Sequence, residues 1–182
     1  MIACNDANTG ISTVAVDALD LPDFHGEDIS SLISDSGITR YRMQTPIWDV
    51  YINDTNPYWY FPEGAYVERF DTMFNVVGFV QSDTAYFYEK PALWHLIGNV
   101  KIQNFQGVEF ETTEMFWRQN EPPESLNAIY SDSVVVIKRP DDEQIIQGGF
   151  RANQSMTEYI FYKHKADIWT EEKPDTTNFQ QN

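Results

Sequence analysis

The stretch that decides the fold is Leu93 to Trp117, LWHLIGNVKIQNFQGVEFETTEMFW. From Trp94 to Ile102 every second residue is apolar or small, whereas the residues between them are mixed. After a turn at residues 104–107 the alternation resumes over residues 108–112, with glutamates at every second position. A period of two with aromatic and β-branched side chains is typical of a strand that buries one face. The stretch therefore predicts two paired strands joined by a turn.

The same pattern recurs along the chain, in short segments separated by turn residues. No segment has the 3.6-residue period of a long amphipathic helix. Further strands are predicted at residues 38–43, 47–52, 58–61, 65–70, 75–81, 85–88, 128–130, 134–138, 144–147, 150–152 and 158–164. Many short strands with regular turns favour an all-β fold, in the form of an antiparallel sandwich, a jelly roll or an open curved sheet.

Two local expectations concern the first third of the chain. Pro46 is expected to end a strand, because proline cannot donate a hydrogen bond to a neighbouring strand. Residues 27–33 are expected to form one helical turn.

The length of 182 residues suits a single domain, which we place at residues 20–168. Residues 1–19 are small and polar and are expected to form a flexible leader or anchor region. Residues 169–182 are expected to form a disordered polar tail.

Composition excludes several classes of function. The net charge of −16 opposes sequence-independent binding to nucleic acid, which requires lysine and arginine against the phosphates. A single cysteine excludes an intrachain disulfide and a cysteine-based zinc site. That cysteine, Cys4, follows a small residue near the start of the sequence, a pattern typical of the cleavage site of a bacterial lipoprotein signal. We therefore predict Cys4 as a lipid-anchor residue.

Catalytic patterns are absent from the sequence. His25, His95 and His164 are far apart and have no metal-ligand spacing, and His95 is expected to be solvated or bonded locally. Three glutamates at positions 109, 111 and 114 form the obvious carboxylate cluster, but acidic side chains on a strand face more often provide solubility and block edge pairing. The sequence predicts a protein that is not an enzyme and has no metal or cofactor.

Aromatic residues make up 15% of the chain, and three hypotheses about their role remain open. Trp48, Trp59 and Trp94 could stack against sugar rings on a glycan-binding sandwich displayed at the cell surface. The same side chains could instead form an ordinary core. A third reading is that the apolar face of an incompletely closed sheet binds acyl chains, because each buried methylene contributes about 0.8 kcal/mol.

Several motifs together resemble the LptC family of periplasmic lipopolysaccharide-transport proteins, within the OstA-like superfamily. The segment 34–43, SDSGITRYRM, resembles the Gly-x-x-x-Tyr-x-Leu opening of the family, and 93–100, LWHLIGNV, resembles its Leu-x-Leu-x-Gly-x-Val strand. Further similarities lie at residues 68–71, 110–113 and 130–152. The motifs follow the family's order over roughly residues 34–160. The aromatic-rich segments 57–64, PYWYFPEG, and 93–100 are most similar to the Bacteroides-type branch.

This resemblance implies an open, twisted antiparallel β-jelly roll, V-shaped in section, whose interior holds the acyl chains of lipid A. It further implies a periplasmic protein, tethered to the inner membrane, that accepts lipopolysaccharide from the inner-membrane ABC transporter. The lipid would then pass to an LptA-like bridge protein joined by strand addition, a geometry that also permits head-to-tail self-association. On this reading the alternation predicts a lipid groove lined by Tyr41, Met43, Val80, Ala85, Trp94, Leu96, Val100, Phe110, Met115 and Phe150.

Overall fold

The structure is a computed structural model that describes residues 21–35, 37–139, 142–146 and 148–163. Over these residues the chain contains no helix, and its 13 strands form one antiparallel sheet, which confirms the all-β prediction and is consistent with a β-jelly roll. The strands are β1 (Phe24–Asp35), β2 (Ile38–Tyr51), β3 (Tyr58–Phe61), β4 (Ala65–Phe70), β5 (Val76–Ser82), β6 (Thr84–Tyr88), β7 (Leu93–Gln103), β8 (Glu109–Arg118), β9 (Ile129–Ser131), β10 (Val135–Arg139), β11 (Asp142–Ile146), β12 (Gly148–Ala152) and β13 (Tyr159–Lys163). The predicted leader, tail and Cys4 lie outside the described residues.

Long strands that change partners at their middle fold the sheet into two layers. In β2, residues 41–44 pair with β4, whereas residues 49–51 pair with β3. In β7, residues 93–97 pair with β6, whereas residues 101–103 pair with β5. In β8, the first half pairs with β10 and the second half with β9. Each of these strands therefore runs through both layers.

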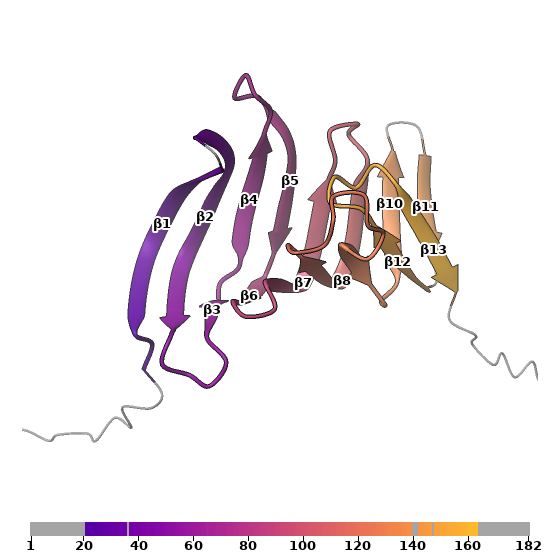
Figure 1. Cartoon of the computed structure of the whole chain (residues 1–182). Coiled ribbons are helices and arrows are strands. Elements are labelled where there is room, and N and C mark those ends of the chain that lie inside the picture. The colour runs from indigo at the N-terminus through magenta and orange to yellow at the C-terminus, as the bar shows by residue number, and fades with distance from the viewer. Residues whose placement is uncertain (1–20, 36, 140–141, 147, 164–182) are drawn as a thin grey trace, which may run out of the picture.

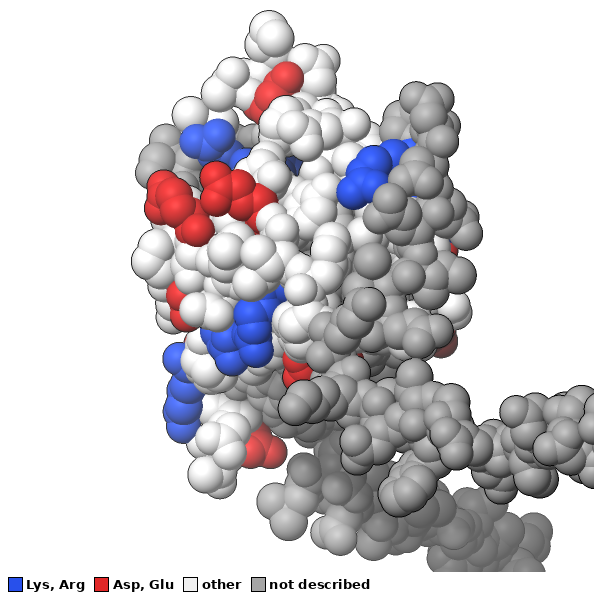
Figure 2. All heavy atoms as spheres, turned by 90° about the vertical axis from the view of Figure 1, so that its right-hand side faces the viewer, with Lys and Arg blue, Asp and Glu red and all other residues white. Residues whose placement is uncertain are grey.

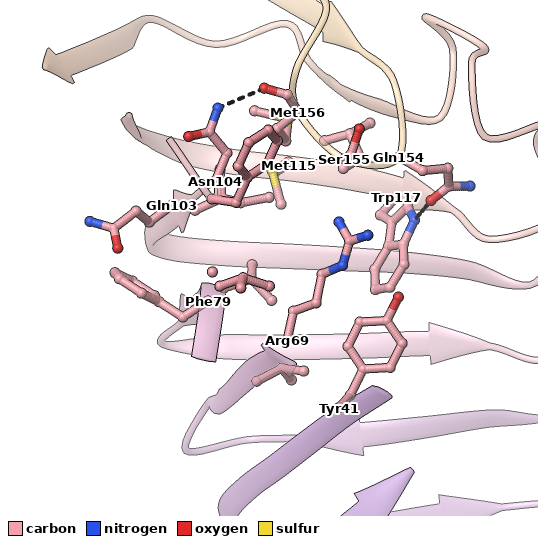
Figure 3. A pocket seen from close by; sticks show the side chains of 17 residues that line it. Tyr41, Arg69, Phe79, Gln103, Asn104, Met115, Trp117, Gln154, Ser155 and Met156 are labelled. Carbon is pink, nitrogen blue, oxygen red and sulfur yellow. Dashed lines mark hydrogen bonds between the residues drawn. The ribbon is translucent and has the colours of Figure 1, made fainter. Parts of the chain in front are cut away.

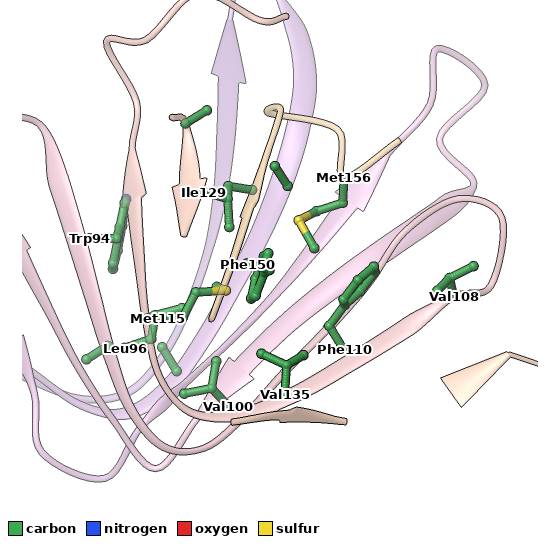
Figure 4. Packing of buried hydrophobic residues seen from close by; sticks show 14 of the residues in the cluster. Trp94, Leu96, Val100, Val108, Phe110, Met115, Ile129, Val135, Phe150 and Met156 are labelled. Atoms are coloured by element: carbon green, nitrogen blue, oxygen red, sulfur yellow. The ribbon is translucent and has the colours of Figure 1, made fainter. Parts of the chain in front are cut away.

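We call the layer that contains β3, β6, β9, β12 and β13 layer I, and the layer that contains β4, β5, β10 and β11 layer II. The strands follow one another from β1 at one end of the molecule to β11 and β13 at the other (Figure 1). The layers meet along a corner formed by the middles of the long strands. Buried side chains lie between the curved strands (Figure 4).

The corner explains why two local predictions are wrong. Asp28 has a left-handed backbone (φ 51°) and lies opposite Pro46, because the pairing of β1 with β2 passes from Glu27↔Ile47 to Ile29↔Thr45. Pro46 and Asp28 therefore face each other at a position that is not itself paired, and because the register is unchanged on either side of it, β2 continues through Pro46. Pairing with β2 along its whole length makes β1 a strand where a helical turn was predicted.

Short polar contacts hold the corner closed. The Thr45 hydroxyl donates to the carbonyl oxygen of Gly64 (2.7 Å), which joins β2 to the β3–β4 turn. The Asp83 N–H donates to the carbonyl of Gly98 (2.9 Å), and its carboxylate accepts from the Asn99 side chain (2.6 Å). Gly64 and Gly98 both have positive φ, and a Cβ on Gly64 would lie 2.1 Å from the carbonyl oxygen of Ser82. Only glycine fits this approach of two backbones.

The layers are packed tightly in the half of the molecule that contains β8 to β13. The ring centroids of Phe110 in layer II and Phe150 in layer I are 5.7 Å apart, and both side chains are fully buried. The loop between β12 and β13 covers this part of the core: its Met156 is buried, and the Asn104 side chain donates to the Met156 carbonyl (2.9 Å). The interior is therefore filled by the protein's own side chains here (Figure 4).

The outer faces of the two layers differ in chemistry. The outer face of layer II carries ion pairs, between Arg42 and Glu68 and between Glu111 and two lysines. The outer face of layer I carries a row of directly paired side chains, whose rings stack on one another except for the tilted pair of Tyr86 and His95: Tyr60, Tyr86, His95, Phe116 and Tyr130. Because the rings stack on one another, the row stabilises the pairing of its own strands.

Two side chains of this row also form hydrogen bonds. His95 Nε2 lies 2.7 Å from Glu114 Oε1, which confirms the prediction of a locally bonded histidine. Burial, with a hydrogen bond to Tyr60, raises the pKa of Tyr86 to about 12.

The corner makes a prediction about stability. Gly64→Ala should destabilise the fold by about 2 kcal/mol or more, because the new Cβ overlaps a backbone oxygen that cannot move freely. Gly107→Ala is the matched control: Gly107 has a similar φ (+77°), but nothing lies within 4 Å of its Cβ position. The control should lose only about 1 kcal/mol, from backbone strain. Equal losses in urea unfolding of the two variants would contradict a close-packed corner.

Candidate functional site

Two cavities lie between the layers, among strands β2, β4, β5, β7 and β8, and the β12–β13 loop closes one side of the first. Cavity I is lined by Tyr41, Val67, Arg69, Val77, Gly78, Phe79, Val80, Ile102, Gln103, Asn104, Phe105, Met115, Trp117, Ile129, Gln154, Ser155 and Met156. Cavity II is lined by Ile33, Tyr41, Met43, Ala65, Val67, Val80, Gln81, Trp94, Leu96, Trp117 and Gln119. Both linings are largely apolar, and four side chains belong to both cavities.

One aromatic pair bridges the layers between the two cavities. The rings of Tyr41, from the layer II half of β2, and Trp117, from the layer I half of β8, have centroids 6.3 Å apart. The Trp117 indole N–H donates to the side-chain oxygen of Gln154, in the β12–β13 loop (Figure 3). This bond fixes Trp117 to the closed half of the molecule and leaves Tyr41 on the opposite wall.

The cavities are narrow as they stand. Cavity I has room of about 70 Å³, and cavity II of about 90 Å³, for solvent-sized groups. This is enough for a few water molecules or a short stretch of a hydrocarbon chain, since one water occupies about 30 Å³ in the liquid. A larger guest requires the layers to part, and the two walls already meet at the Tyr41–Trp117 contact.

The ten side chains predicted to line a groove divide into two groups. Those that line a cavity are Tyr41, Met43, Val80, Trp94, Leu96 and Met115. Those that are fully buried in the core and line neither cavity are Ala85, Val100, Phe110 and Phe150. Strand alternation places all ten on the inner side of the sheet, but it does not distinguish a filled part of the interior from an open one.

The sequence did not predict several of the residues that line the cavities. Val67 and Arg69 alternate with Glu68 on β4, a short pattern that gave no face assignment by itself. Trp117 lies two residues after Met115 on β8, so the alternation that places Met115 on the inner side also places Trp117 there. Gln154 comes from a loop, where no periodicity exists to reveal it.

Two indole N–H groups beside this interior lack acceptors. Trp94 lines cavity II and is only 7% exposed, and its Nε1 has no hydrogen-bond partner among the described residues. The Nε1 of Trp48 is likewise without a partner there. A buried donor left unpaired costs about 1–3 kcal/mol, so an oxygen acceptor brought by a guest would be stabilised at Trp94.

The tryptophans named for glycan stacking face inward. The rings of Trp48 and Trp59 lie 5.1 Å apart, and Trp48 also stacks on Phe61. Phe61 stacks in turn on Trp94 at 5.6 Å. All three tryptophans pack in or against the core, and their neighbours cover ring faces that a sugar would need.

The glutamate cluster is divided among separate partners. Glu111 lies between Lys101 (2.6 Å) and Lys138 (2.7 Å), and hydrogen bonds from these two lysines lower its pKa to about 2. Glu114 is bonded to His95. In the part of the chain that the structure describes, no group of three or more histidine, cysteine or acidic side chains could hold a metal ion.

The sheet has free edges at both ends. Among the described strands, β1 pairs only with β2, β11 only with β10, and β13 only with β12. Figure 2 shows the molecule from the end at β11 and β13, where basic and acidic side chains are interspersed among uncharged ones. Free edges present backbone N–H and C=O groups that can pair with a further strand.

Comparison with known proteins gave no relatives: no protein-family model matches the chain, and no curated protein matches it. Within the described residues, no helix is long and apolar enough to cross a membrane.

The ion pairs of Glu111 predict a dependence of stability on pH. Because its pKa is about 2 in the folded protein and ordinarily about 4.5, its contribution is present above pH 4.5 and is lost as pH falls toward 2. Glu111→Gln should therefore lower the free energy of unfolding by about 1 kcal/mol at pH 7 and by less at pH 3. Glu109→Gln, on the same face of β8, controls for net charge. Urea titrations giving the same loss at both pH values would refute this assignment.

Proposed function

We propose that this protein is a non-enzymatic lipid carrier of the LptC type, which receives lipopolysaccharide from an inner-membrane ABC transporter and transfers it to the next periplasmic module. The observation that carries the proposal is the apolar interior between two layers, which the protein's own side chains fill at one end and leave partly empty at the other. Acyl chains of lipid A would complete the packing in the unfilled part.

The geometry of the corner supports this use of the interior. The layers are joined by continuous strands and short polar contacts at the corner, so they can separate on the opposite side without loss of the sheet. There the rings of Tyr41 and Trp117 touch, and Met43, Val67 and Val80 pack in the same apolar cluster as Trp94 and Leu96. The aromatic contact contributes about 0.5–1.5 kcal/mol, and acyl chains that enter would replace the apolar contacts with contacts of the same kind.

The free edges support the proposed partners. β1 has 12 residues, and such an edge can accept a strand from another OstA-like module. β11 and β13 offer the corresponding edges at the other end, so a chain of modules could join their interiors into one continuous path. On this proposal the transporter hydrolyses ATP, and the present chain needs no catalytic group.

The alternative, a glycan-binding sandwich, receives less support from the same features. It requires tryptophans exposed on one surface, whereas Trp94 is buried and Trp48 and Trp59 pack against each other with tilted rings. The aromatic row on the outer face of layer I is half-buried, and its rings stack on their neighbours in the row. Sugar rings bind to free aromatic faces, which neither set provides.

Site-specific photo-crosslinking in cells tests the proposal. A photoreactive residue at Val67 or Ile102, on the walls of the cavities, should crosslink to lipopolysaccharide when the transporter is supplied with ATP. The matched controls are Glu68 and Lys101, the neighbours of these residues on the outer side of the same strands. Crosslinks from the outer positions only, or none from the inner positions of a folded variant, would end the lipid-carrier proposal.

A further inference from the structure

Among the described residues that line the two cavities, one is a cation: Arg69, which is exposed to solvent and stands at the rim of cavity I. The register of layer II places Arg69 of β4 between Tyr41 of β2 and Gly78 of β5, so its side chain belongs to the inner side of the sheet. Gly78 carries no side chain beside Arg69, and the backbone of Gln103 approaches so closely that a Cβ on Gly78 would lie 2.5 Å from its carbonyl oxygen. Figure 3 shows Arg69 extending from β4 into the space between the layers, beside Tyr41 and toward Trp117.

Arg69 differs in charge from the other residues that line the cavities. Among all the described residues that line either cavity, it is the one with a formal charge at neutral pH. Its exposed guanidinium forms no ion pair or hydrogen bond with another described residue, although the chain has 28 acidic residues against 12 basic ones. By contrast, Arg42, on the outer side of the neighbouring strand, is paired with Glu68.

The two cavities differ in polarity. Besides Arg69, cavity I has amide and hydroxyl side chains along its wall, from Gln103, Asn104, Gln154 and Ser155. Cavity II is lined mainly by hydrocarbon and aromatic groups, with Trp94 as its buried N–H donor. Because the cavities share the wall formed by Tyr41 and Trp117, a molecule that occupies both would meet a cationic end and an apolar end.

We propose that Arg69 binds the anionic group of an amphiphile whose acyl chain lies in the cavities. The ligand class is then an acyl lipid with a phosphate or carboxylate near the start of the chain. A guanidinium suits either anion because it donates two parallel hydrogen bonds to a pair of oxygens. This inference rests on the proposed function and adds to it. Although the protein as a whole is strongly negative, Arg69 would present a positive charge to the anionic group of the lipid.

Binding of chain-matched ligands tests the inference. Isothermal titration of the full chain with dodecyl phosphate, dodecanoate and dodecanol, all below their aggregation concentrations, compares one chain with three headgroups. The wild-type protein should bind at least one of the anions about tenfold more tightly than dodecanol, the scale of one charge-assisted hydrogen-bonded contact. Arg69→Gln should abolish that preference while leaving dodecanol binding unchanged, and Arg69→Lys should restore part of it.

The matched control is Arg40→Gln, which removes the same charge from the opposite face of β2. It should keep the headgroup preference, since Arg40 alternates with the inward-facing Tyr41. Inorganic phosphate at equal concentration should not displace dodecyl phosphate, because the chain supplies most of the affinity. Displacement would identify a site for free phosphate and overturn the proposal.

The remaining outcomes separate this inference from the function on which it rests. Equal affinity of the wild-type protein for all three ligands would overturn the role of Arg69 and leave the lipid-carrying interior in place. If Arg69→Gln weakens the binding of dodecanol as much as that of the two anions, Arg69 contributes only to packing, and the proposed role in binding the anion is overturned. Binding of none of the three ligands would overturn both proposals.

Discussion

The bend that β2, β7 and β8 share is the constraint on which the rest of the structure depends. Because each strand hydrogen-bonds to one layer over its first half and to the other layer over its second half, the layers cannot separate at the corner without breaking the sheet. The corner is correspondingly built from close backbone approaches, at Gly64 and Gly98, and from the side-chain oxygens of Thr45 and Asp83. Any change in the volume of the interior must therefore come from the angle between the layers.

That angle is fixed in one half of the molecule and less so in the other. Phe110 and Phe150 fill the space in the first half, and the β12–β13 loop ties the layers together through Asn104 and Gln154. In the second half the Tyr41–Trp117 pair and the apolar side chains around it lie beside two narrow cavities, with the exposed Arg69 at the rim of one of them. A rigid end and a more open end in one sheet suit a protein that takes up a hydrophobic guest and releases it.

Much of the fold could be predicted from alternation alone, because a period of two fixes both the strand and its buried side. The corner, where the long strands pass from one layer to the other, could not be predicted in this way. The sequence predicts a break at Pro46 because its missing N–H is evident from the residue alone, whereas the unpaired position opposite Asp28 that accommodates it depends on the pairing with β1. The site was predictable to the same extent: inward positions such as Leu96 were found, but whether Phe110 faces a cavity or a filled core depends on a loop far along the sequence. Arg69 was missed because an alternation of three residues does not reveal which side is inside.

The central claim is that the layers part to admit acyl chains, and the distance between the two ends of β2 measures it most directly. Spin labels on cysteines replacing Ile38 and Ile52, both exposed and on opposite sides of the corner, report the bend of this strand when Cys4 is replaced by serine. Pulsed electron paramagnetic resonance should give a longer mean distance when lipopolysaccharide is added than in its absence. A distance distribution that does not change at saturating lipid would contradict the account.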